Sequence, residues 1–99
     1  MTPAELRSRL QGANPPVVLD VRSESEFAAG HVTNAINVEY SAILARPLAA
    51  LSVPKDAEIV LYCGSGRRAA AAIEALRAAG YQKLNHLAGD YPGWRASQP

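Results

Sequence analysis

Short hydrophobic runs alternate along the chain with segments that carry signals for the start of a helix. Residues 17–21 and 58–62 form nearly continuous hydrophobic runs after proline-containing breakers, a pattern typical of strands buried on both faces. Residues 36–38 and 83–87 predict two further, shorter strands. We therefore expect four strands that are separated by helical segments.

The first two helices are predicted from their N-terminal signals. Thr2 and Glu5 have the spacing of a capping box, so we expect a helix that begins there and ends before Gly12. The segment from Ser23 to Glu26 has the same spacing and predicts a short helix that stops at Gly30.

The later segments predict two more helices and an irregular end. Residues 41–51 carry hydrophobic residues at helical spacing, but Pro47 should prevent one unbroken helix. Residues 67–79 predict a longer helix that ends at Gly80, and residues 89–94 suggest a turn-rich tail. This alternation of strands and helices indicates a layered α/β sandwich with a mainly parallel sheet.

Composition and charge narrow the possible classes of protein. The chain has 99 residues, of which 48% are hydrophobic, as expected of one globular domain spanning residues 1–99. Its formal net charge of +1 provides no basic surface for nucleic acid or membrane, so we expect neither partner. No signal-peptide pattern and no apolar run of about 18 residues is present, which favours a cytoplasmic location.

The single cysteine, Cys63, is the candidate for chemistry. One thiol excludes an internal disulfide framework and a cysteine-based zinc site, since both need several. Cys63 follows the predicted strand 58–62 at its carboxyl end, where parallel α/β sheets bind ligands. Gly64 and Gly66 allow backbone N–H groups to converge, while Arg67 and Arg68 add positive charge. These features predict a nucleophilic thiolate in a site that binds anions at a helix N-terminus.

Other interpretations of Cys63 are less favoured. Most lone cysteines are inert buried side chains, but an inert cysteine needs no glycine- and arginine-rich loop after it. Cysteine phosphatases place an arginine six positions after the cysteine, where this chain has Ala69. Here the arginine comes one position earlier, at Arg68, and the shorter loop suits a single sulfur atom better than a phosphoryl group.

Three sequence blocks resemble single-domain rhodaneses, the thiosulfate sulfurtransferase family. The loop CGSGRR at 63–68 is similar to the family pattern C-x-x-G-x-R, and residues 87–94 resemble its C-terminal block L-x-G-G-x-x-x-W. The N-terminal block consists of VLDVR (18–22), EF (26–27), GHV (30–32) and AIN (35–37). The resemblance implies a three-layer α/β/α sandwich around a small, mainly parallel sheet.

The resemblance also implies a cycle in which Cys63 carries sulfur as a persulfide. A thiosulfate-like anionic donor would supply the sulfur, and a thiol or cyanide would accept it, with no metal or organic cofactor. Arg68 would stabilise the loop and its anion, and Arg67 would meet the donor at the rim. The implied substrate-binding residues are Gly64, Ser65, Gly66, Arg67 and Arg68. The alternative is a rhodanese-fold sulfur carrier or partner-binding module with little thiosulfate turnover of its own.

Two positions depart from the family pattern. Ala69 stands where the family often has serine or threonine, so one possible hydroxyl donor to the loop is missing. Asp90 replaces the second glycine of the C-terminal block, and we expect its carboxylate near the pocket mouth to disfavour small dianionic donors. For Asp20 and Arg22 the resemblance favours a structural role over an acid/base pair.

Overall fold

A computed structural model describes residues 1–98 and contains one four-stranded parallel sheet. Its strands are β1 (Val17–Asp20), β2 (Ile36–Asn37), β3 (Glu58–Tyr62) and β4 (Lys83–His86). They lie in the order β2-β1-β3-β4, and Val18 of β1 is paired with Val60 of β3. The central strand β3 therefore has a hydrogen-bonded neighbour on each side, and its carboxyl end is held in place by the sheet.

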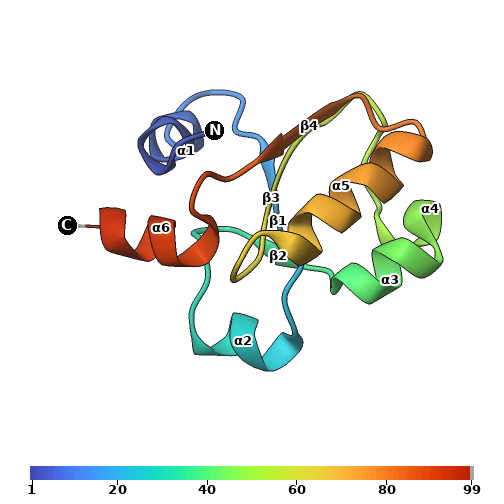
Figure 1. Cartoon of the computed structure of the whole chain (residues 1–99). Helices are drawn as coiled ribbons and strands as arrows, with labels where there is room; N and C mark the ends of the chain where they lie inside the picture. Colours follow the sequence, from blue (N-terminus) through green and yellow to red (C-terminus); the bar gives the residue numbers. More distant parts are fainter. Residues whose placement is uncertain (99) are drawn as a thin grey trace.

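Helices cover both faces of the sheet, so the three-layer prediction is confirmed (Figure 1). On one side, α3 (Tyr40–Ala45), α4 (Pro47–Ala50) and α5 (Arg67–Ala78) share a core with Leu19 and Leu61. On the other side, α1 (Pro3–Leu10) and α6 (Asp90–Ser97) pack over the face that carries Val18 and Tyr62. The short helix α2 (Glu24–Ala29) follows β1. Each inner strand thus alternates its side chains between two hydrophobic cores.

The predicted helix starts are confirmed by side-chain hydrogen bonds. The Thr2 hydroxyl accepts the Glu5 N–H while the Glu5 carboxylate accepts the Thr2 N–H, which is a complete capping box. Ser23 and Glu26 make the same reciprocal pair at α2. The predicted interruption at Pro47 is also present, because it begins α4 directly after α3 has ended.

The prediction of a turn-rich tail at residues 89–94 was wrong, because α6 begins at Asp90 and continues to Ser97. Gly89 and Asp90 have φ angles of +76° and +53°, so the turn is confined to the entry of the helix. Pro92 falls in the first turn, where a missing N–H costs no helical hydrogen bond. Local turn signals therefore described the start of α6 and hid the helix that follows.

A buried ion pair joins the ends of β1 and β3. Asp20 is fully buried and accepts hydrogen bonds from the Arg22 guanidinium at 2.6–3.1 Å and from the Tyr62 hydroxyl at 2.6 Å. Arg22 also donates to the Gly30 carbonyl at 2.7 Å. Burial, followed by the bond to Asp20, raises the pKa of Tyr62 above its ordinary value. This network supports the structural interpretation of Asp20 and Arg22.

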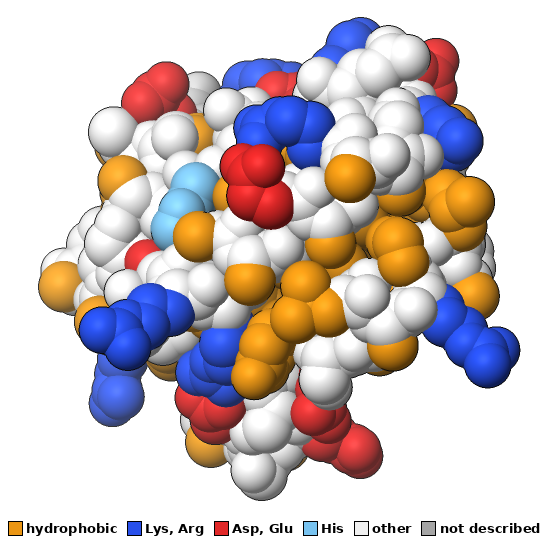
Figure 2. Space-filling view, turned by 45° about the vertical axis from the view of Figure 1, so that its right-hand side comes forward, with side chains coloured by type: hydrophobic (Ala, Val, Ile, Leu, Met, Phe, Trp, Pro, Cys, Tyr) orange, Lys and Arg blue, Asp and Glu red, His pale blue; other side chains and the backbone are white. Residues whose placement is uncertain are grey.

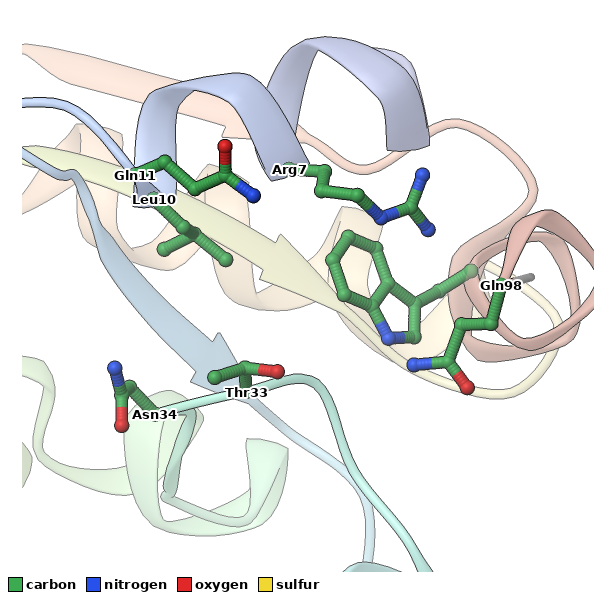
Figure 3. Close-up of a pocket in the computed structure, with 7 residues that line it drawn as sticks. Arg7, Leu10, Gln11, Thr33, Asn34 and Gln98 are labelled. Carbon is green, nitrogen blue, oxygen red and sulfur yellow. The ribbon is translucent and has the colours of Figure 1, made fainter.

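Two surface features are formed by the helices that flank the sheet. Hydrophobic side chains gather on the face formed by α3 and α4, where Leu44 and Leu48 are 47% and 57% exposed (Figure 2). A hollow of about 440 Å³ lies on the α1 and α6 side (Figure 3). It is lined by Arg7, Leu10, Gln11, Thr33, Asn34, Trp94 and Gln98. Trp94 is buried there with Arg7 over its ring at 4.9 Å, consistent with a packing role.

Among residues 1–98, no helix has the length and hydrophobicity needed to cross a membrane.

Candidate active site

Cys63 lies at the carboxyl end of β3, and its sulfur is held by the backbone of the loop that follows. The side chain is fully buried. Its Sγ atom accepts the Gly66 N–H at 3.0 Å and the Ala69 N–H at 3.4 Å. Gly66 has a φ of +97°, a conformation that favours glycine, and it stands at the N-cap of α5. The loop therefore places N–H dipoles around the sulfur, as expected of a site that stabilises a thiolate.

The predicted substrate-binding residues share this loop but differ in exposure. Ser65 and Arg67 are exposed, whereas Gly64 and Arg68 are partly buried. A Cβ atom at Gly64 would lie 3.4 Å from the Arg68 guanidinium, so the side chain of Arg68 passes close to the loop backbone. The structure thus brings all five predicted loop residues together with Cys63, with Arg67 on the outer surface.

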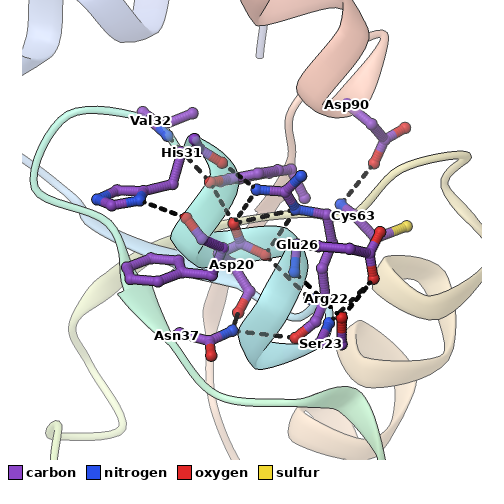
Figure 4. Close-up of polar contacts among 12 residues, drawn as sticks. Asp20, Arg22, Ser23, Glu26, His31, Val32, Asn37, Cys63 and Asp90 are labelled. Atoms are coloured by element: carbon purple, nitrogen blue, oxygen red, sulfur yellow. Dashed lines mark hydrogen bonds and ion pairs between the residues drawn. The ribbon is translucent and has the colours of Figure 1, made fainter.

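Arg68 is paired with Glu26, a residue that was predicted only as part of a capping box. Its two terminal nitrogens lie 2.8 and 3.1 Å from the two Glu26 carboxylate oxygens (Figure 4 shows Glu26). The hydrogen bond from Arg68, opposed by desolvation and aided by those from Ser23, lowers the pKa of Glu26 to about 2. The same bond raises the pKa of Arg68. Helix α2 is thereby tied to the Cys63 loop.

Replacing Arg68 with glutamine should raise the pKa of Glu26 from about 2 towards its ordinary value of 4.5. A carboxylate with a lowered pKa stabilises the fold above its unfolded pKa, and this contribution is lost as the pH falls through the folded value. A carbon-13 NMR titration of the Glu26 carboxylate measures the shift directly. Arg67→Gln is the matched control, because Arg67 is exposed and should leave the pKa of Glu26 low. Equal titration curves for both variants would contradict the pairing.

Asp90, held by His86, makes a hydrogen bond to the backbone of the Cys63 loop. Asp90 Oδ1 accepts the Cys63 N–H at 3.0 Å, a bond that is shown in Figure 4. The same oxygen lies 2.8 Å from His86 Nε2. The Tyr91 N–H donates to the Cys63 carbonyl at 3.0 Å. Asp90 is only 7% exposed. The expectation that its carboxylate lies near the pocket mouth was therefore wrong: the positive φ of Asp90 directs the chain so that its side chain binds the loop backbone.

The two histidines have ordinary partners within residues 1–98. His31 stacks on Phe27 with ring centroids 3.7 Å apart, and its Nδ1 lies 2.8 Å from the Phe27 carbonyl oxygen. His86 is bound to Asp90. No group of three or more histidine, cysteine, aspartate or glutamate side chains in the described part of the chain could hold a metal ion.

Comparison with known proteins gives the class to which this fold and site correspond. The family model described as "Rhodanese-like domain" matches residues 2–97. A protein named sulfurtransferase from Allochromatium vinosum is 30% identical over 89 residues, which cover 90% of this chain and 80% of that relative. The chain belongs to the rhodanese-like domain family.

Other relatives and solved structures agree with this assignment. The probable adenylyltransferase/sulfurtransferase MoeZ of Mycobacterium tuberculosis is 34% identical over 95% of this chain, which spans only 24% of MoeZ. The human single-domain sulfurtransferase TSTD1 superposes with a TM-score of 0.87 at 29% identity, covering 100% of this chain and 96% of that one. The Alr3790 protein from Anabaena has a TM-score of 0.89 at 28% identity, covering 100% of this chain and 79% of that one.

Proposed function

We propose that the protein is a sulfurtransferase in which Cys63 carries sulfane sulfur as a persulfide, from a donor such as thiosulfate to a thiol or to cyanide. The observation that carries the proposal is the pair of N–H groups, from Gly66 and Ala69, that point at Cys63 Sγ. Such dipoles stabilise the thiolate that attacks the donor and the anionic persulfide that results. The family relationship supports this chemistry. The proposal treats residues 1–99 as one domain.

In the proposed first step, the Cys63 thiolate attacks the outer sulfur of thiosulfate. A new sulfur–sulfur bond forms on Cys63, the sulfur–sulfur bond of thiosulfate breaks, and sulfite leaves with the electron pair. An acceptor thiolate then attacks the outer sulfur of the persulfide and restores Cys63. The burial of Cys63 favours this transfer over attack on a phosphate ester, because a buried sulfur is reached more easily by a slim group than by a tetrahedral one.

The experiment that tests this proposal has two stages. The purified protein is incubated with thiosulfate, and intact-mass and peptide mass spectrometry should detect one added sulfur atom on Cys63. Addition of cyanide should then remove that atom and produce thiocyanate. No added sulfur from thiosulfate, a polysulfide or a low-molecular-weight persulfide would refute the proposal.

A second candidate function is a sulfur carrier that docks onto a partner protein. The exposed hydrophobic face of α3 and α4, which carries Leu44 and Leu48, favours it because such a face suits a protein contact. The same experiment separates the two functions. Sulfur on Cys63 without repeated turnover supports the carrier, whereas sustained thiocyanate formation supports the enzyme.

A further inference from the structure

Four charged side chains surround the Cys63 loop, and their formal charges cancel. Arg68 is neutralised by its pair with Glu26. Asp90 adds a second carboxylate behind the loop, while Arg67 adds a second guanidinium at the exposed rim. His86 contributes a positive charge only when its imidazole is protonated. The loop is therefore not the strongly positive site that two adjacent arginines suggest from sequence.

The Asp90 carboxylate is the most buried of these four charges. Its Oδ1 atom is fixed by the Cys63 N–H and by His86. Its Oδ2 atom would lie 3.1 Å from a Cβ atom at Gly66, the same residue whose N–H points at the Cys63 sulfur. Because the side chain is buried, solvent screens its field less than it screens the field of the exposed Arg67.

This arrangement penalises donors in proportion to their negative charge. A thiosulfate dianion must approach a sulfur nucleophile that is itself anionic, with the Asp90 carboxylate behind it. An alkyl persulfide carries at most one negative charge and delivers the same sulfane sulfur. We infer that Asp90 determines donor specificity, so that the site favours persulfide donors with at most one negative charge over dianionic thiosulfate. This inference rests on the proposed function and specifies its substrate class.

The persulfide reaction balances without an external oxidant or reductant. The Cys63 thiolate attacks the outer sulfur of the protonated alkyl persulfide, and a sulfur–sulfur bond forms on Cys63. The original sulfur–sulfur bond breaks, and the alkyl thiolate leaves with the electron pair. The proton stays with the transferred sulfur, which remains sulfane sulfur throughout.

The test compares single-turnover loading of Cys63 from thiosulfate and from 2-hydroxyethyl persulfide, measured by mass spectrometry. We expect the wild-type protein to load faster from the persulfide. In Asp90→Asn the side-chain oxygen can still accept the Cys63 N–H, but the negative charge is gone. The ratio of the thiosulfate rate to the persulfide rate should therefore rise about tenfold, as expected for one partly screened charge several ångströms away. A loss of structural support alone would slow both donors and leave their ratio unchanged.

Asp56→Asn is the matched control, because Asp56 is an exposed aspartate in the turn before β3, at the opposite end of that strand from Cys63. Its rate ratio should equal that of the wild type. An Asp90→Asn ratio within about twofold of wild type would overturn the inference while leaving the proposed function intact. If Cys63 loads from neither donor, the proposed function itself fails.

A measurement on the wild-type protein keeps the inference testable even if Asp90→Asn does not fold. When the charges of the loop cancel, the Cys63 thiolate leaves the site net negative, so loading from the thiosulfate dianion should not slow, and should speed up modestly, as salt rises from about 0.01 M to about 0.15 M and the screening length falls several-fold. A net positive loop would instead attract the dianion and lose this attraction as salt is added. A steep fall in the rate with salt would overturn the inference.

Discussion

Replacement of Cys63 with serine should reduce sulfur transfer by at least about a thousandfold, because it removes the nucleophile while preserving its surroundings. The serine hydroxyl can accept the same N–H groups of Gly66 and Ala69 that contact Sγ. Serine is also a far weaker nucleophile than a thiolate at neutral pH. Thiocyanate formation from thiosulfate and cyanide, together with the intact mass after donor treatment, measures the loss.

The control for this substitution is the stability of the variant protein. Thermal unfolding followed by circular dichroism should show that Cys63→Ser remains folded under assay conditions. Cys63 is the only cysteine in the chain, so no second thiol can replace it. Turnover by the serine variant at more than about a tenth of the wild-type rate would show that Cys63 does not carry the sulfur.

Asp20→Ala should lower the free energy of unfolding by about 3–5 kcal/mol, because it leaves the Arg22 guanidinium buried without its partner. Arg22 is only 6% exposed, and the Tyr62 hydroxyl would lose its acceptor as well. A domain of this length has a total stability of about 5–15 kcal/mol, so this single substitution should remove a large part of it. Urea unfolding followed by circular dichroism measures the change.

Two further variants show whether the loss comes from the buried pair. Tyr62→Phe removes the hydrogen bond to Asp20 and the one that the Tyr62 hydroxyl accepts from the Val32 N–H, but it keeps the ion pair, and it should cost about 1–3 kcal/mol. Asp56→Ala removes an exposed aspartate and should change the stability by no more than about 0.5 kcal/mol. A cost for Asp20→Ala as small as that of Asp56→Ala would show that the network does not stabilise the fold.

Features that depend on neighbouring residues could be predicted from the sequence. The capping boxes at Thr2 and Ser23 act within one helical turn, so their spacing alone is sufficient. The interruption at Pro47 follows from the chemistry of proline. The position of Cys63 after a buried strand and before a helix likewise required no knowledge of the rest of the chain.

Features that depend on distant residues could not be predicted in this way. Glu26 has a complete local explanation in its capping box, and this concealed its pairing with Arg68, which lies 42 positions away. The Asp90 carboxylate accepts the Cys63 N–H, although the two residues are 27 positions apart. The direction of the Asp90 side chain depends on a positive φ, which aspartate adopts only occasionally. The sequence therefore identified the candidate nucleophile and its loop and singled out Asp90, but it did not show where the Asp90 carboxylate lies or that Glu26 pairs with Arg68.

The Cys63 sulfur has a second role that follows from its contact with α5. Gly66 stands at the N-cap position of this helix and has no side chain to accept the free N–H groups of the first turn. Cys63 Sγ accepts the Ala69 N–H instead, which is the bond that a capping serine or aspartate would ordinarily make. The proposed sulfur-carrying atom is therefore also the cap of α5. Each addition or removal of sulfur should change the amide hydrogen exchange at Ala69, so the start of the helix reports how far the reaction has advanced.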